Sequence, residues 1–325
     1  MVHCTTNEAV HVSPRQHQRV HKSSAPCDAP GRQNVGRRCA HVDAITSRLA
    51  GCACILVLAR KEIRDSLRNR WFVLYAVAFA VLSLGLSWLS LAGTGSTGFA
   101  GFGRTAAGLI NLVMLIVPLM ALTAGAGSLA GERERGTLSY LLSQPVSRFE
   151  VLLGKYVGLA VAMLAALALG FGISAVAISV RGGVTDAARF LQLVGFAYLL
   201  SLAMLSVGFL ISTLVSKQSV AMAAALFLWL TMAFLGDLGL MGSALAFKLQ
   251  VQQLFHLSLI NPLQAFKMAS LGSLHASLDV LGPAGLYATQ TYGKALIVIF
   301  IGVLAAWVVL PLCVAQIIFQ RRGAA

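Results

Sequence analysis

Six long apolar stretches constrain this 325-residue chain more than any other feature. A helix needs about 20 apolar residues to cross a bilayer, because each residue advances it about 1.5 Å and every backbone polar group must be satisfied within it. We therefore predict an all-α polytopic membrane protein with six transmembrane helices. The predicted spans are Trp71–Leu91, Gly108–Ser128, Tyr156–Val180, Leu191–Leu214, Ser219–Gly239 and Ala295–Ile318.

The composition excludes the soluble classes. Hydrophobic residues make up 58% of the chain and charged residues 11%, whereas an average soluble domain has roughly 25% charged residues. A soluble protein of this size would need a charged surface that this sequence lacks. Collagen-like, disulfide-scaffold and disordered classes do not agree with 31 glycines, six cysteines and that apolar content.

The basic residues are distributed unevenly over the connecting segments. If the N-terminus is cytoplasmic, seven of the 25 Lys and Arg residues precede residue 49, twelve lie in later inner segments and six lie in outer segments. Cytoplasmic flanks of membrane spans retain positive charge, so this asymmetry predicts that both termini are cytoplasmic. The net charge of +14 is thus mainly a signal of orientation.

Residues 1–52 form a polar, basic segment, which we predict to be a disordered extension before a transmembrane domain at residues 53–325. The extension holds most of the candidate soft metal ligands, namely His3, His11, His17, His21, His41, Cys4, Cys27 and Cys39. A metal-binding tail is the alternative, but the cysteines form no C-x-x-C pair and we assign no metal site. Without aromatic residues to stack on bases, the segment does not indicate nucleic-acid binding.

A helix with two distinct faces is predicted just before the first span. Apolar residues recur at helical spacing at Leu56, Ala59, Ile63, Leu67 and Trp71. The opposite face holds Arg60, Lys61, Arg64, Asp65 and Arg68. This pattern is typical of an amphipathic helix on the cytoplasmic membrane surface, in contact with the lipid bilayer.

The inner segment between the second and third spans has the spacing of a phosphate loop without its chemistry. Gly131 and Gly136 are separated by four residues, but Thr137 stands where a nucleotide-binding Lys is required, and no strand precedes the segment. If the protein uses ATP and Mg²⁺, we expect both on a partner chain. The sequence also shows no nucleophile–base constellation, so we predict no catalytic residue.

The same segment predicts a short helix from Glu132 to Leu142. Leu138, Leu141 and Leu142 form an apolar edge, while residues 132–135 carry charges of both signs. Complementary charges fix the register of docking, so this end is suited to a groove on a partner. The alternative is a solvated loop whose charges keep it out of the membrane.

The pattern E-R-E-R-G-T-L at 132–138, with L-L-S-Q-P-V-S-R at 141–148 and L-L-G-K at 152–155, resembles the first cytoplasmic loop of six-span ABC exporter permeases of the type 2 export class. The resemblance implies a non-catalytic homodimeric permease of the bacterial cytoplasmic membrane that binds cytoplasmic ABC ATPase subunits. It implies an ATPase-coupling role for Glu132, Arg133, Glu134, Arg135, Gly136, Thr137 and Leu138.

Two further stretches resemble one branch of that family, so that the similarity covers about residues 57–322. They are residues 59–71 and the outer residues 261–269 with 276–285. This branch serves maturation of the copper–sulfur centre of periplasmic nitrous-oxide reductase. The resemblance implies a periplasmic β-helix partner, with a copper chaperone as a further candidate. The implied docking residues are Asn261, Pro262, Phe266, Asp279, Gly282 and Pro283.

Ionisable residues are almost absent from the predicted spans. Asp237, near the outer end of the fifth span, is the candidate functional residue in the membrane, with an interfacial anchor as the alternative. In the outer loop at 242–293, His256, Met268 and His275 are too scattered to predict a metal site.

Two other functions remain open. One is a general exporter permease for a lipid, drug or polysaccharide, against which the outer stretch argues. The other is a non-transporting membrane scaffold. The sequence also leaves open whether a sulfur compound, copper or only mechanical work crosses the membrane.

Overall fold

The computed structural model describes residues 55–92, 99–142, 147–180, 187–247, 251–273 and 295–322. These residues belong to one compact unit, Arg48–Ala325. The extension predicted at residues 1–52 lies outside the described residues, as do three of the predicted outer docking residues, Asp279, Gly282 and Pro283.

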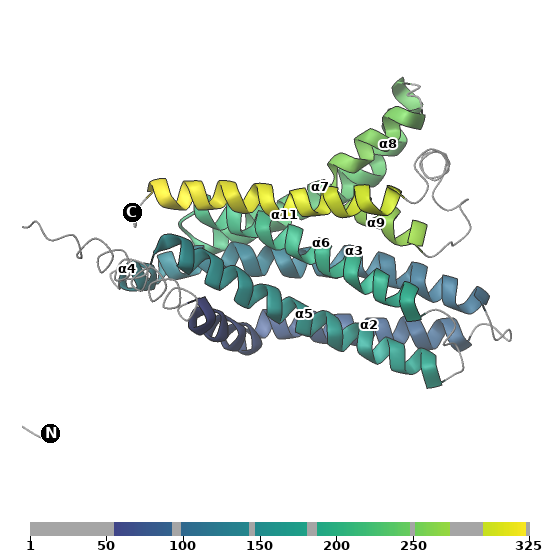
Figure 1. Ribbon diagram of the computed structural model, residues 1–325, viewed down its shortest axis with the longest axis horizontal. Coiled ribbons are helices and arrows are strands. Elements are labelled where there is room, and N and C mark those ends of the chain that lie inside the picture. Colours follow the sequence, from purple (N-terminus) through teal and green to yellow (C-terminus); the bar gives the residue numbers. More distant parts are fainter. Residues whose placement is uncertain are drawn as a thin grey trace, which may run out of the picture. The chain divides into compact units, whose positions relative to one another are not determined.

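Helices account for all the regular structure of the described residues (Figure 1), which confirms the all-α prediction. A helix at residues 55–68, here called the N-terminal helix, comes first. It is followed by α2 (Arg70–Ala92), α3 (Phe99–Glu134), α4 (Thr137–Leu142), α5 (Arg148–Val180), α6 (Ala187–Leu214), α7 (Gln218–Phe247), α8 (Val251–Ile260), α9 (Pro262–Ser273) and α11 (Ala295–Arg322).

Six of these helices, α2, α3, α5, α6, α7 and α11, are long and apolar enough to cross a membrane, as the sequence predicted. The helix α5 begins well before its predicted span because Ser147 and Glu150 cap it. The N–H of Ser147 donates to Glu150 Oε2 at 2.9 Å, and the N–H of Glu150 donates to Ser147 Oγ at 3.2 Å. This reciprocal pair satisfies two backbone donors at the helix start.

The helices α3 and α6 form the centre of the bundle, with α7 and α2 against α3, and α11, α5 and α9 against α6. The two central helices cross at Gly125 and Gly208. A Cβ atom on Gly208 would lie 2.7 Å from the carbonyl oxygen of Leu122 and 3.0 Å from Cα of Gly125. Small residues let membrane helices approach this closely and gain packing contacts.

The helix α9 is part of the bundle. Phe266 is completely buried, and Pro262 is buried beside it. A direct docking role for Phe266 is therefore wrong, because its side chain fills the core. Asn261 starts α9, since its Oδ1 accepts the N–H of Leu263 at 3.0 Å, and its Nδ2 donates to the carbonyl oxygen of Met232 at 2.7 Å.

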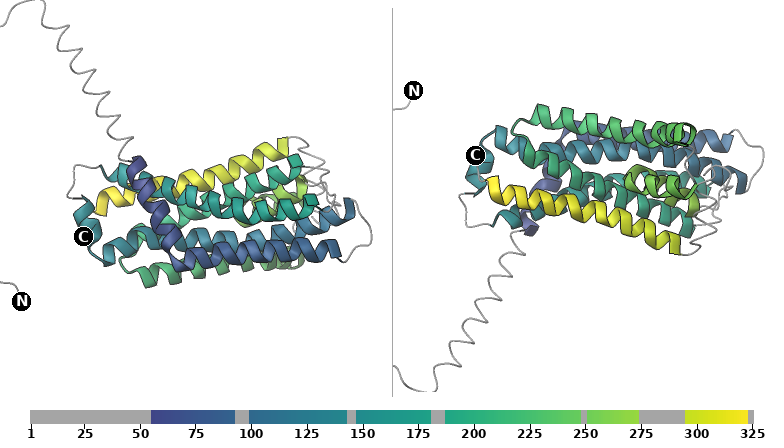
Figure 2. Two further views of the ribbon diagram at one scale, coloured as in Figure 1. Left: turned by 90° about the horizontal axis from the view of Figure 1, so that it is seen from below. Right: turned by 90° about the horizontal axis from the view of Figure 1, so that it is seen from above.

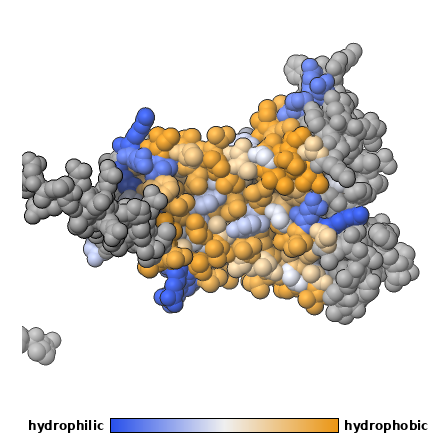
Figure 3. Space-filling view, viewed as in Figure 1, coloured by the Kyte–Doolittle hydropathy of each residue, from blue (hydrophilic) through white to orange (hydrophobic). Residues whose placement is uncertain are grey.

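Apolar side chains cover the middle of the bundle, and hydrophilic ones lie towards its ends (Figure 3). The spans of α2, α7 and α11 bury little of their surface within the chain, whereas α6 is mostly buried. Asp237 lies on α7, which continues to Phe247. The side chain of Asp237 is outside the described part of the chain.

The α3–α6 crossing yields a test with a matched control on the same helix. We expect Gly208→Ala to lower the thermal unfolding temperature of the purified protein, because overpacking costs about 1–3 kcal/mol. A Cβ atom on Gly195 would meet no other described helix within 4 Å. Gly195→Ala should therefore be neutral or stabilising. Equal unfolding temperatures for the two variants would contradict the close crossing.

Candidate functional site

The N-terminal helix has three faces. Leu58, Ala59, Glu62 and Ser66 are buried against the bundle. The predicted apolar residues Leu56 and Leu67 are exposed on the chain, on a side suited to lipid. The basic residues Arg60, Lys61, Arg64 and Arg68 are exposed as well. The face that contacts the protein is thus centred on Glu62, a residue to which the sequence analysis gave no role.

Two glycines bring this helix onto α5. A Cβ on Gly158 would lie 2.7 Å from the carbonyl oxygen of Ala59 and from Cβ of Glu62, and a Cβ on Gly154 would lie 2.9 Å from Cβ of Leu58. The N-terminal helix crosses the bundle at a steep angle (Figure 2, left). The close crossing places Glu62 beside Lys155, which lies between the two glycines on α5.

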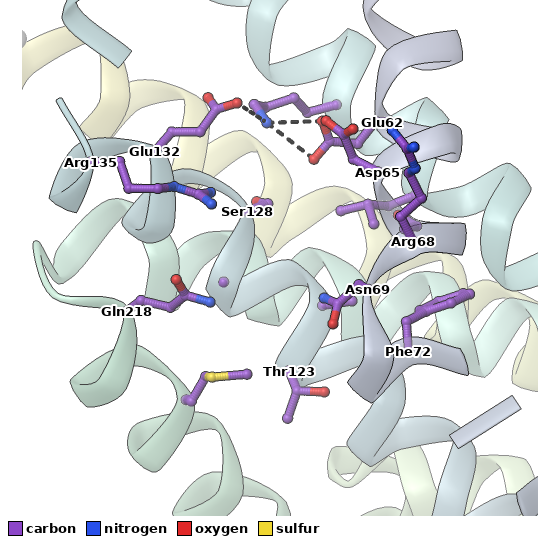
Figure 4. A pocket seen from close by; sticks show the side chains of 16 residues that line it. Glu62, Asp65, Arg68, Asn69, Phe72, Thr123, Ser128, Glu132, Arg135 and Gln218 are labelled. Carbon is purple, nitrogen blue, oxygen red and sulfur yellow. Dashed lines mark hydrogen bonds and ion pairs between the residues drawn. The ribbon is translucent and has the colours of Figure 1, made fainter. Parts of the chain in front are cut away.

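Lys155 is the centre of a buried ion cluster that we call the Lys155 cluster, made of Glu62, Glu132 and Lys155 (Figure 4). The Lys155 side chain is 1% exposed, and its Nζ donates to Glu62 Oε1 at 3.1 Å and Oε2 at 3.0 Å. The same Nζ lies 3.0 Å from Glu132 Oε1. Lys61 Nζ approaches that oxygen from the exposed side at 3.4 Å. One ammonium therefore joins the N-terminal helix, the end of α3 and the start of α5.

The charge balance of the cluster makes it dependent on Lys155. Burial raises the pKa of the Glu62 carboxyl, because desolvation of its charged form outweighs the attraction of Lys155, and Glu132 adds repulsion. With both carboxylates ionised, the three buried groups carry one excess negative charge, which Lys61 partly offsets. Buried ion pairs contribute little net stability, but loss of one partner leaves an uncompensated charge.

The loop after the cluster turns sharply into α4. The helix α3 ends at Glu134, and Gly136 adopts φ 71°, in the left-handed region that favours glycine. The predicted helix from Glu132 to Leu142 is therefore two helices, because this turn interrupts it. Residues 143–146, which include Pro145, are outside the description.

The charged residues of the predicted coupling motif have partners within the chain. Glu132 is buried in the Lys155 cluster, so its predicted place on an exposed docking surface is wrong. Arg133 Nη1 donates to the carbonyl oxygen of Val215 at 3.2 Å, and Glu134 Oε2 accepts the N–H of Gln218 at 2.8 Å. The carboxylate of Glu134 thereby caps α7.

The remaining residues of the motif are placed differently. Arg135 Nε donates to the carbonyl oxygen of Gly131 at 3.0 Å, and Thr137 Oγ1 donates to that of Glu132 at 3.2 Å. Leu138 is buried, whereas Tyr140 is 73% exposed. The charged residues thus position α4, and α4 itself presents Tyr140 outward.

A second polar contact closes the same end of the bundle. Arg148 Nη1 donates to the carbonyl oxygens of Phe319 at 3.2 Å and Gln320 at 2.9 Å. These are carbonyls of the last turn of α11, where a cation is favourable. We call this end, which holds the N-terminal helix, α4 and the last turn of α11, the charged end.

A cavity of about 510 Å³ lies beside the Lys155 cluster. Its wall comes from the N-terminal helix, α2, α3, α5 and α7, and Figure 4 shows the side chains around it. Among the residues that the structure describes, no group of three or more His, Cys, Asp or Glu side chains is placed to hold a metal ion.

Sequence reasoning missed Lys155 and Glu62, although both had local signals. Ser147-Arg-Phe-Glu150 is a capping box that starts α5 early and places Lys155 inside a helix. Gly154 and Gly158 surround Lys155 with small-residue spacing typical of a close helix contact. A lysine inside such a contact indicates a buried charge that requires an acidic partner.

The cluster predicts that two substitutions by uncharged residues lower the stability of the protein by different amounts. Lys155→Met leaves two buried carboxylates facing each other, so we expect a loss of about 3–5 kcal/mol and a markedly lower unfolding temperature. Glu62→Gln leaves a neutral Lys155–Glu132 pair and should cost much less. Thermal unfolding of both purified variants checks this order, and a Glu62→Gln variant as unstable as Lys155→Met would contradict it.

The raised pKa of Glu62 predicts a pH dependence. A carboxyl with a raised folded-state pKa stabilises the fold most below its ordinary value, 4.5, and this contribution falls as pH rises through the raised pKa. We therefore expect Glu62→Gln to flatten the pH dependence of the unfolding temperature just above pH 4.5. Wild-type and variant curves that remain parallel across this range would exclude the linkage.

Comparison with known proteins identifies the family of this chain. The family model of the ABC-2 family transporter protein matches residues 56–324. The chain is 33% identical over 271 residues to the probable ABC transporter permease protein NosY of Stutzerimonas stutzeri, covering 82% of this chain and 97% of that protein. It is 34% identical over 229 residues to the NosY of Pseudomonas aeruginosa, covering 69% of this chain and 83% of that protein. The chain belongs to the ABC-2 family and is an ABC transporter permease.

Proposed function

We propose that this permease couples ATP hydrolysis on a separate ATPase to transport or mechanical work in maturation of the copper–sulfur centre of periplasmic nitrous-oxide reductase. The similarity to two NosY permeases over most of the chain supports the pathway. The observation that supports coupling is the Lys155 cluster, because it ties the segment that carries α4 to two other helices.

The coupling path in this proposal runs from α4 into the bundle through polar contacts. In this path a displacement of α4 moves Glu132 at the end of α3. The ion pairs of Lys155 then transmit this displacement to α5 and to the N-terminal helix. The hydrogen bond between Glu134 and the N–H of Gln218 transmits the same displacement to the start of α7. Buried contacts of this kind have discrete arrangements, so a small displacement at α4 shifts whole helices.

The ATP and Mg²⁺ are assigned to a NosF-like ATPase subunit, and this chain is a non-catalytic subunit. We place it in the bacterial cytoplasmic membrane with both termini cytoplasmic, as the distribution of basic residues indicates. The charged end then faces the ATPase. The exposed apolar faces of α2, α7 and α11 leave room for lipid and for a second copy in a homodimer.

The outer partner in this proposal is a NosD-like β-helix protein, with a copper chaperone as a further component. Because Pro262 and Phe266 are buried, we assign α9 a structural role beneath the surface that binds this partner. Asn261 is half-buried at the start of α9, and the exposed residues Gln252 and His256 on α8 are nearer to a partner.

Tyr140 gives the sharpest test of the docking surface. A large aromatic that is 73% exposed on α4 is the kind of anchor that dominates interfaces. We expect Tyr140→Ala to weaken copurification of the ATPase by about 2 kcal/mol, roughly thirtyfold, and to reduce reductase maturation. Trp88→Ala, near the C-terminal end of α2, is the control and should leave copurification of the ATPase unchanged. Unchanged ATPase binding by Tyr140→Ala would remove α4 as the docking element.

A second test separates a coupled permease from a membrane scaffold. The full chain is coexpressed with its ATPase, either active or inactivated in its own nucleotide site, and the copper–sulfur centre of the reductase is measured spectroscopically. We expect assembly of the centre to fail with the inactive ATPase, although the complex still forms. Normal assembly in that strain would favour the scaffold.

A further inference from the structure

The cavity beside the Lys155 cluster has the size of a ligand site. Its volume of about 510 Å³ lies within the roughly 300–1,000 Å³ of small-molecule pockets. Side chains from five helices form its wall, including Asp65 and Arg68 of the N-terminal helix and Gln218 of α7. A molecule bound there would contact elements that are distant in the sequence.

The wall carries three acidic side chains, Glu62, Asp65 and Glu132, and three basic ones, Arg68, Arg135 and Lys155. Glu62 and Glu132 lie together at Lys155, so this part has one excess negative charge. Arg135 lies on one side of the cavity with Gln218, and Arg68 lies on the opposite side (Figure 4). A net anion or a net cation would meet like charge on part of this wall, whereas a dipolar molecule matches both signs.

The neutral part of the wall also fits a short polar molecule. Ser66, Asn69, Thr123 and Ser128 also line this space. The hydroxyls of Thr123 and Ser128 donate to the carbonyl oxygens of Leu119 and Gly125, so their oxygens can accept a further hydrogen bond. Leu159 and Met222 supply a small apolar area for a few carbon atoms. Convergent polar groups on a partly apolar wall are typical of sites that orient a small ligand.

One buried oxygen provides independent support. Glu132 is 8% exposed, and its Oε2 makes no hydrogen bond within the described part of the chain, although Oε1 contacts Lys155 and Lys61. A buried polar atom without a partner is rare and favours an additional donor nearby. An ammonium group near the cluster would supply that donor and offset the excess negative charge.

We propose that this cavity binds a small zwitterion that carries a primary ammonium and an acidic oxyanion. The ammonium lies towards Glu132, and the oxyanion lies towards Arg68 on the opposite side of the cavity. Free amino acids and the phosphoethanolamine headgroup of a lipid both have this chemistry. The site does not depend on the proposed role in reductase maturation, because it rests only on the wall of this chain.

The test uses the full chain, purified in detergent or in phosphatidylcholine nanodiscs without phosphatidylethanolamine. The probes are O-phosphoethanolamine and L-cysteine, with ethanolamine and inorganic phosphate as single-charge controls. We expect at least one zwitterion to raise the unfolding temperature saturably, by roughly 3–6 °C. We expect the single-charge controls to have little effect. No response to either zwitterion, or an equal response to inorganic phosphate, would overturn the proposal.

Two arginines on one helix give a matched pair of variants. Arg68 is part of the cavity wall and Arg64 is not, while both residues are exposed. Arg68→Gln should weaken binding of the zwitterion about tenfold through loss of a charge-assisted contact. Arg64→Gln should bind as the wild type does. Equal affinities for the two variants would place the ligand elsewhere.

The source of the zwitterion is decided by lipid exchange. If it is a headgroup, nanodiscs that contain phosphatidylethanolamine should stabilise the wild type and suppress the response to soluble O-phosphoethanolamine. If it is a solute, L-cysteine should bind equally in both kinds of nanodisc. Either result supports the zwitterion site, whereas stabilisation by phosphatidylethanolamine that survives Arg68→Gln unchanged would contradict it.

Discussion

The burial of one lysine between two glutamates is the constraint on which the charged end depends. An ammonium that is 1% exposed must be paired, and its two partners come from the N-terminal helix and the end of α3. The glycines at 154 and 158 allow the close approach that this pairing requires. The cluster fixes how the helices are arranged but contributes little net stability, because the desolvation of its charges opposes their attraction. As a result, the N-terminal helix, the end of α3 and the start of α5 are held together, although they are far apart in the sequence.

The position of this cluster also explains the geometry of the segment between α3 and α4. Glu132 is fixed in the cluster, Arg133 and Glu134 are fixed to the α6–α7 turn, and Gly136 then directs α4 away from α3. The charges of this motif therefore serve inside the chain, and the outward surface is left to α4 and Tyr140. A loop held at so many points transmits displacement, whereas a free loop would absorb it.

The sequence predicted the elements better than their contacts. Six spans, a helix before the first span and a helix in the coupling loop follow from apolar length and periodicity, which are local properties. The role of Glu62 could not be predicted, because its partner Lys155 is distant in the sequence and the face of the N-terminal helix that meets α5 is offset from its apolar face. Phe266 was misjudged for a similar reason: an aromatic residue in a long outer loop is expected to be exposed until α9 is seen packed against α6 and α11.

A distance measurement shows whether the Lys155 cluster makes the N-terminal helix and α4 move together. Spin labels on Arg64 and Ser139, in a background without other reactive cysteines, report the separation of these two exposed positions in the ATPase-bound complex. We expect one narrow distance that stays constant between nucleotide-free and ATP-bound states, and that broadens in the Lys155→Met background. A wild-type distance that changes with ATP would show that the two segments move independently and that the Lys155 cluster does not couple them.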